Sequence, residues 1–131
     1  MLNWIKKSLQ KLNPRAQEIA ANEQKRHKLL HKALDKLPRL RQGGAITDII
    51  EDIRWLIHML KSYFTGAYQQ IPWETVLVII AALIYFVSPL DLLPDFLPGG
   101  IVDDAAVFGF VLKTVRKDIE LYKTWLNSSM E

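Results

Sequence analysis

The clearest pattern in the chain is a series of hydrophobic residues that recur every three or four positions: Ile46, Ile49, Ile50, Ile53, Leu56, Ile57, Leu60 and Phe64. This spacing places them on one face of an α-helix, with polar residues on the other face. We expect the helix to run from about Ala45 to Phe64 and to end before Gly66, because glycine readily terminates helices. A helix with one apolar face must pack against another part of the protein or against a partner.

Two other stretches are apolar on every side. Residues 76–87 contain no charged residue, and they follow Pro72, which is well placed at a first helical position. Residues 105–112 form the apolar first half of a last helix, which we expect from about Asp103 to Leu126. A helix that is apolar all round is buried all round, either in protein or in lipid.

The first 42 residues have a different pattern. Residues 2–12 predict a short amphipathic helix that ends at Asn13-Pro14, and residues 15–37 predict one long helix with a narrow apolar stripe. Because a narrow stripe buries little surface, we expect this part to be the most mobile. The sequence thus predicts an all-α protein. Its parts are a basic helical arm (residues 1–42) and a helical domain (residues 43–131) that contains the apolar hairpin at about residues 75–115.

Charge is distributed unevenly between these parts. Residues 1–41 carry eleven Lys or Arg and three Asp or Glu, whereas residues 42–131 carry six basic and eleven acidic residues. A basic segment of this kind predicts an anionic partner. The aromatic interleaving that is typical of single-stranded nucleic-acid binding is missing between positions 5 and 54, so we do not expect nucleic acid as the partner. The residues expected to contact anionic lipid or an acidic protein are Lys6, Lys7, Lys11, Lys25, Arg26, Lys28 and Lys32.

Length and charge limit how the apolar hairpin could enter a membrane. The uncharged run between Glu74 and Asp91 has sixteen residues, whereas a membrane-spanning helix needs about 20. The return stretch, residues 105–112, is only roughly 12 Å long as a helix. Basic residues flank the pair on both outer sides, which would place both ends in the cytoplasm. We therefore expect a shallow or re-entrant hairpin rather than a two-pass crossing.

A turn rich in proline, glycine and aspartate separates the two apolar stretches. Ser88 can cap a short helix that has Pro89 at its first position and Asp91 shortly after. We interpret the aspartates of the turn as helix caps. The alternatives are a cluster that binds a cation such as Mg²⁺ or Ca²⁺, passes protons or docks a partner. The candidate residues are Ser88, Pro89, Asp91, Pro94, Asp95, Gly99, Gly100, Asp103 and Asp104.

Residues 85–104, with the sequence YFVSPLDLLPDFLPGGIVDD, closely resemble the signature of the YkvA-like family. This is a bacterial family of unknown function whose members are small and mostly membrane-associated. The resemblance covers about residues 75–115. It implies a helical hairpin linked to membranes, and it brings no established reaction. Residues 98–100 depart from the family pattern, in which this loop tends to be slightly longer and to contain a bulky residue.

Other motifs do not indicate catalysis. The chain has no cysteine and no pattern typical of a serine nucleophile, a glycine-rich phosphate loop or a Rossmann fold. His27 and His31 are four residues apart and could share a metal ion, but we interpret them, with Glu23 and Asp35, as an exposed stripe of ion pairs. We therefore expect neither a cofactor nor enzymatic activity.

The leading hypothesis is a non-enzymatic accessory or scaffold protein on the cytoplasmic face of the bacterial inner membrane. The hairpin would embed in or dock on the membrane, and the basic arm would contact anionic lipid or a protein partner. Two alternatives stay open. One is a soluble helical homo-oligomer in the cytoplasm that acts as an interaction module, and the other is a protein that handles cations or protons with its Asp cluster.

Overall fold

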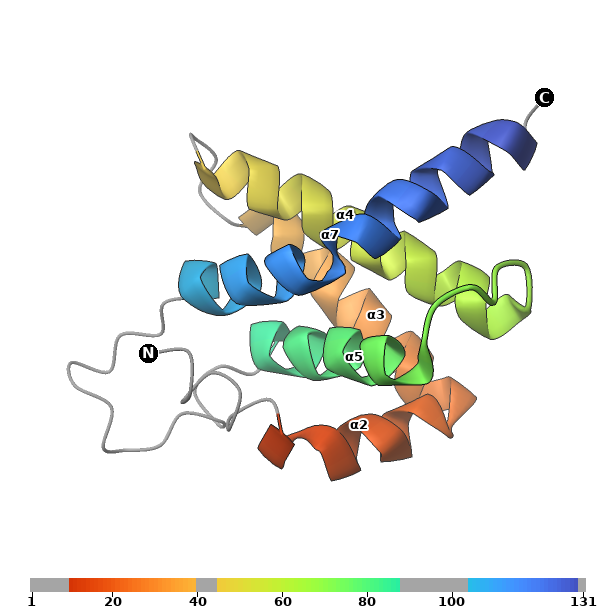
Figure 1. The fold of residues 1–131 in the computed structure, drawn as a ribbon. Helices are drawn as coiled ribbons and strands as arrows, with labels where there is room; N and C mark the ends of the chain where they lie inside the picture. Colours follow the sequence, from red (N-terminus) through yellow and green to blue (C-terminus); the bar gives the residue numbers. More distant parts are fainter. Residues whose placement is uncertain (1–9, 40–44, 88–103, 130–131) are drawn as a thin grey trace.

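The structure is a computed structural model that describes residues 10–39, 45–87 and 104–129. All regular structure in these ranges is helical, which confirms the predicted all-α fold. Figure 1 shows how the helices cross one another in a compact bundle. In chain order they are α2 (Asn13–Ala20), α3 (Glu23–Lys36), the short 3-10 helix η1 (Leu37–Arg39), α4 (Ala45–Thr65), α5 (Trp73–Val87) and α7 (Asp104–Ser129).

The most apolar helix, α5, lies at the centre of the fold. It packs against α2, α3 and α7, and Figure 1 shows it between α2 and α7. Ten of its fifteen residues are buried, including the unbroken run of residues 79–86, and Val78 and Val87 are half-buried. The expectation that the apolar hairpin enters lipid stays a prediction, which must be weighed against this burial of α5. Its apolar surface is covered within the chain, and insertion would expose the core residues that now pack on it.

The single long helix expected over residues 15–37 is wrong, because the chain breaks at Ala21 and Asn22. Pro14 stands in the first positions of α2, where its missing N–H has no cost. Asn22 has an extended backbone (φ −126°, ψ 114°), and its side-chain oxygen accepts a 3.0 Å hydrogen bond from the Lys25 N–H. Asn22 therefore caps α3, and the break lets α2 and α3 pack against each other as well as against α5.

The narrow apolar stripe of α2 and α3 buries more surface than its width suggests. Three of its six buried residues are alanines, whose small side chains allow close packing on α5. His27 lies outside this apolar stripe and is exposed. The domain boundary near residue 42 stays a prediction. The stripe residues that belong to the same hydrophobic core as α5 are Leu12, Ala16, Ala20, Leu29, Ala33 and Leu37.

The bounds predicted for α4 are confirmed within one residue. The helix ends at Thr65, and Gly66 follows with φ +88°, a left-handed conformation that strains residues with a side chain. The Gly66 N–H donates to the Tyr63 carbonyl at 3.1 Å, which closes the last turn. Pro72 then precedes α5, and its carbonyl accepts the Val76 N–H at 3.0 Å.

α4 packs on α7 through an aromatic cluster around Tyr122. The Tyr122 side chain is fully buried, and its hydroxyl forms hydrogen bonds with His58 Nδ1 and, at 2.6 Å, with Ser62 Oγ. The rings of Tyr68 and Trp125 lie 5.0 and 5.7 Å from the Tyr122 ring, edge-on and stacked respectively. Burial raises the pKa of Tyr68, and the nearby Asp118 carboxylate adds to this shift. The cluster holds α7 against α4, and α7 in turn covers part of α5.

Candidate functional site: a basic pocket on α2 and α3

Most residues predicted for the Asp-Pro-Gly turn lie outside the described residues. These are Ser88, Pro89, Asp91, Pro94, Asp95, Gly99, Gly100 and Asp103. Asp104 is the first residue of α7, a position at which the helix dipole favours an acidic residue. The capping, cation and docking hypotheses for this turn therefore stay predictions.

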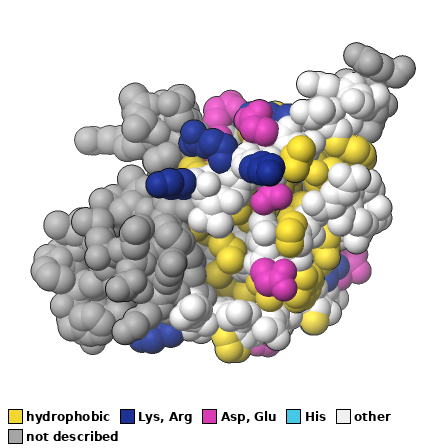
Figure 2. Space-filling model, viewed as in Figure 1, with side chains coloured by type: hydrophobic (Ala, Val, Ile, Leu, Met, Phe, Trp, Pro, Cys, Tyr) yellow, Lys and Arg dark blue, Asp and Glu magenta, His cyan; other side chains and the backbone are white. Residues whose placement is uncertain are grey.

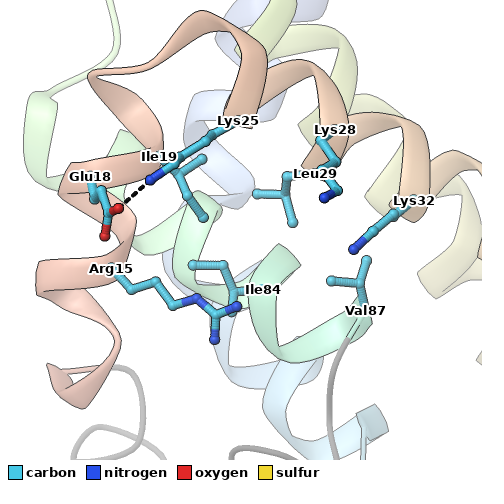
Figure 3. A pocket seen from close by; sticks show the side chains of 9 residues that line it. All are labelled: Arg15, Glu18, Ile19, Lys25, Lys28, Leu29, Lys32, Ile84 and Val87. Carbon is cyan, nitrogen blue, oxygen red and sulfur yellow. Dashed lines mark hydrogen bonds and ion pairs between the residues drawn. The ribbon is translucent and has the colours of Figure 1, made fainter.

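The predicted basic contacts fall into several groups. Lys6 and Lys7 lie outside the described residues, and Lys11 is exposed. Lys25, Lys28 and Lys32 line one pocket of about 320 Å³, which lies between α2, α3 and the end of α5 (Figure 3). The complete lining combines four basic residues and one acidic residue with an apolar floor: Arg15, Lys25, Lys28, Lys32, Glu18, Ile19, Leu29, Ile84 and Val87.

Helical spacing explains why the lysines share this pocket. Lys25, Lys28 and Lys32 are three and four residues apart and therefore occupy one face of α3. Arg15 and Glu18 are likewise three residues apart on α2. The break at Asn22 turns α2 back beside α3, so that the two charged faces border the same hollow, as Figure 3 shows.

One charge pair crosses the pocket edge. Lys25 Nζ donates to Glu18 Oε1, the dashed contact in Figure 3, and forms an ion pair with it. This hydrogen bond, followed by the Lys25 charge and more weakly by that of Arg15, lowers the pKa of Glu18 from its ordinary value of 4.5. Glu18 is therefore ionised at neutral pH.

The other three cations of the pocket are not neutralised in this way. No carboxylate in the described parts of the chain forms an ion pair with Arg15, Lys28 or Lys32. With Glu18 and Lys25 included, the pocket has a formal charge of +3 at neutral pH. Such an excess of positive charge over an apolar floor suits an anion that also has an apolar part.

Arg26, predicted to act with the lysines, has a structural place instead. Its guanidinium donates to the Ala20 carbonyl at 2.5 Å and lies 4.3 Å from the centroid of the Phe64 ring. It thus satisfies a carbonyl at the end of α2 and joins α2 to α4. Sequence reasoning missed Arg15 as a pocket residue, because its position opposite the lysines depends on the unrecognised break.

Each of the two candidate metal ligands on α3 lies near a carboxylate one turn away on the same helix. His27 Nε2 lies 3.7 Å from Glu23 Oε1, and His31 Nε2 lies 3.3 Å from Asp35 Oδ2, with all four side chains exposed. This is the exposed stripe that the i,i+4 spacing predicts. In the described residues, no group of three metal-binding side chains is found.

The described part of the face shown in Figure 2 differs from this pocket, because its surface is mixed in charge. Basic and acidic side chains occur there side by side, between patches of hydrophobic side chains. Among the described helices, none combines the length and the apolar character needed to span a bilayer.

Comparison with known proteins gives the chain a family. Residues 75–110, which run from α5 to the first part of α7, match a family described as a protein of unknown function (DUF1232). The chain is 36% identical over 77 residues to the "Uncharacterized membrane protein YkvA" of Bacillus subtilis (strain 168), a match that covers 58% of this chain and 73% of that relative. No solved structure matches the chain. The resemblance that residues 85–104 carry is thus confirmed, and the chain belongs to the YkvA-like family of proteins of unknown function (DUF1232).

Proposed function

We propose that this protein is a non-enzymatic accessory or scaffold protein that associates with the cytoplasmic face of the bacterial inner membrane by binding anionic lipid. The basic pocket carries this proposal. Within the described residues, its Arg15, Lys28 and Lys32 form no ion pair. A Lys or Arg near an anionic bilayer contributes about 1 kcal/mol of attraction. The membrane protein of Bacillus subtilis to which the chain is similar adds support.

The burial of α5 favours association at the membrane surface over the shallow or re-entrant hairpin. Each large apolar side chain that leaves a protein core for water forgoes about 1.5–3 kcal/mol. If α5 moved into lipid, its own side chains would be covered again. The buried residues of α2, α3 and α7 that share its core would not, and they include Leu29, Ala33 and Val115. Binding through the outer face of α2 and α3 leaves this core intact.

No catalytic arrangement is part of the proposal. His58 and Ser62 are four residues apart on α4, but both form hydrogen bonds with the buried Tyr122 hydroxyl. The histidine is therefore not placed to take a proton from the serine, and neither residue lines the basic pocket.

Vesicle co-sedimentation tests the proposal. We expect the wild-type protein to bind vesicles that contain phosphatidylglycerol and not vesicles of phosphatidylcholine alone, with binding that falls as salt rises. The combined substitution of Arg15, Lys28 and Lys32 by Gln should abolish most of this binding. Wild-type protein that stays in the supernatant with every vesicle would refute the proposal.

A matched control removes the same charge from another helix. Lys113, Arg116 and Lys117 are exposed on α7 and do not line the pocket. Their combined substitution by Gln should leave vesicle binding close to that of the wild type. If this variant loses as much binding as the pocket variant, net charge rather than the pocket drives association.

The soluble homo-oligomer is the second candidate function. It is favoured by two large hydrophobic side chains at the surface, Trp73 at 44% and Leu121 at 50% exposure. Isolated exposed hydrophobic residues are common on monomers, so this support is weaker than that of the pocket. Sedimentation velocity without vesicles or detergent distinguishes the two. A stable oligomer that ignores anionic vesicles would favour the second candidate.

A further inference from the structure

We infer that the basic pocket holds the headgroup of a single anionic phospholipid. The phosphate would lie between Arg15, Lys28 and Lys32, and the first methylene groups of the lipid would lie against the apolar floor. This inference rests on the proposed membrane association and adds to it a ligand class and a one-to-one stoichiometry.

The charges of the pocket fit one compact phosphate. A guanidinium offers a planar pair of donors that matches phosphate oxygens, and ammonium groups add point charges. Figure 3 shows the Arg15, Lys28 and Lys32 side chains around the hollow, whereas Lys25 is turned to Glu18. An acidic peptide carries several separate negative charges, and one of them would meet the Glu18 carboxylate at the pocket edge. A single phosphate avoids this repulsion.

The apolar floor indicates an amphiphile rather than a free anion. Leu29 and Ile84 are buried, and Ile19 and Val87 are half-buried beside the charged groups. Inorganic phosphate would use the cations and leave the exposed parts of Ile19 and Val87 facing water. The glycerol and first methylene groups of a lipid would cover them and gain hydrophobic stabilisation.

The size of the pocket limits how much of the lipid it can hold. Its volume of about 320 Å³ is at the lower end of the roughly 300–1,000 Å³ of small-molecule sites. The headgroup region fits, whereas the remainder of two acyl chains does not. The chains would stay in the bilayer, which would orient the outer face of α2 and α3 towards the membrane.

A soluble short-chain lipid tests the inference without a membrane. Dihexanoyl phosphatidylglycerol, kept below its micelle concentration, should produce saturable one-to-one shifts of the Ile19 and Ile84 methyl resonances. Dihexanoyl phosphatidylcholine at the same concentrations should not. The double substitution Lys28→Gln and Lys32→Gln should weaken binding by about tenfold or more. A Lys113→Gln and Lys117→Gln variant should bind like the wild type.

Two further ligands separate the contribution of the phosphate from that of the acyl chains. Glycerophosphoglycerol, which has the headgroup without acyl chains, and inorganic phosphate should both bind more weakly than the short-chain lipid. If inorganic phosphate binds as tightly as the lipid, the apolar floor plays no role and the inference is overturned.

The result also separates the inference from the proposed function. Vesicle binding without saturable short-chain binding would overturn the headgroup site and leave membrane association standing. Saturable short-chain binding by a protein that ignores phosphatidylglycerol vesicles would support the headgroup site and refute association with the membrane.

Discussion

Two helices of this protein suggest a membrane for opposite reasons. α5 is apolar on every side, whereas α3 carries five basic residues among its fourteen. The fold places α5 at the centre, with ten residues buried, and leaves three of the α3 lysines around an open pocket. An apolar sequence indicates that a helix must be buried, but it does not indicate whether protein or lipid buries it. The exposed charges of α3 indicate the binding partner of this protein better than the apolar surface of α5 does.

This difference has a consequence that experiments can test. A change in α5 should affect the stability of the fold in plain buffer, with no lipid or detergent present. A change in the exposed lysines of α3 should affect anion binding with little effect on stability. Stability and binding should therefore respond to different helices.

The substitution Leu83→Ala should have the largest effect. Leu83 is fully buried in α5, and the loss of its side chain leaves a cavity, so we expect the free energy of unfolding to fall by about 2–5 kcal/mol. Urea denaturation in detergent-free buffer measures this loss. Lys28→Gln, on an exposed residue, is the control and should stay within about 0.5 kcal/mol of the wild type. If both substitutions change the free energy of unfolding equally, α5 would again be a candidate for contact with lipid.

The helices around this core were largely predictable because each carries a local signal. α4 has a one-sided hydrophobic pattern and ends where Gly66 permits a left-handed turn. α5 is a strongly apolar stretch behind Pro72, and its observed start at Trp73 agrees with that signal. α7, expected to begin at about Asp103, begins one residue later and continues to Ser129.

The candidate site was less predictable because it lies between helices. Asn22 is a good N-cap, but Ala20 and Ala21 before it favour a continuous helix, so local preferences conflict there. Without the break, Arg15 belongs to the same helix as Lys28 and cannot face it. The choice of the helices that cover α5 likewise depends on tertiary packing. The hydrophobic spacing along one segment does not predict it.

Lys36→Met should have the second largest effect on the free energy of unfolding, because Lys36 connects α3 to α5. Its Nζ donates to the Phe86 carbonyl and lies 4.8 Å from the centroid of the Phe86 ring. Phe86 is next to the end of α5, where carbonyls lack helical partners and cations are favoured. We expect a loss of about 1–2 kcal/mol in urea denaturation. Lys32→Met, one turn earlier and exposed, should cost much less, and a similar loss from both would contradict the capping role.

Asn22→Ala tests the break that forms the pocket. The N-cap hydrogen bond to the Lys25 N–H is lost, and we expect the free energy of unfolding to fall by about 1 kcal/mol. Gln24→Ala, in the exposed first turn of α3, is the control and should change little. Unchanged stability together with increased helical circular dichroism would show that residues 15–37 prefer one continuous helix.

Glu18→Gln should have the smallest effect on stability. Lys25 holds the pKa of Glu18 below its ordinary value of 4.5, so the ion pair stabilises the fold above that pH and loses its contribution as pH falls through the folded-state pKa. Both side chains are exposed, and exposed pairs contribute little. Thermal unfolding at pH 7 should therefore barely distinguish this variant from the wild type.

Its effect on anion binding has a definite sign. The substitution removes the acidic charge of the pocket and releases Lys25, so the formal charge rises from +3 to +4. We expect tighter binding of phosphatidylglycerol vesicles at pH 7. The advantage over the wild type should shrink as pH falls through the Glu18 pKa, because the wild-type carboxyl then also loses its charge. Lys25→Gln breaks the same pair but lowers the charge to +2, and it should weaken binding. If both variants bind more weakly than the wild type, the ion pair acts by shaping the pocket, and the electrostatic account of α3 fails.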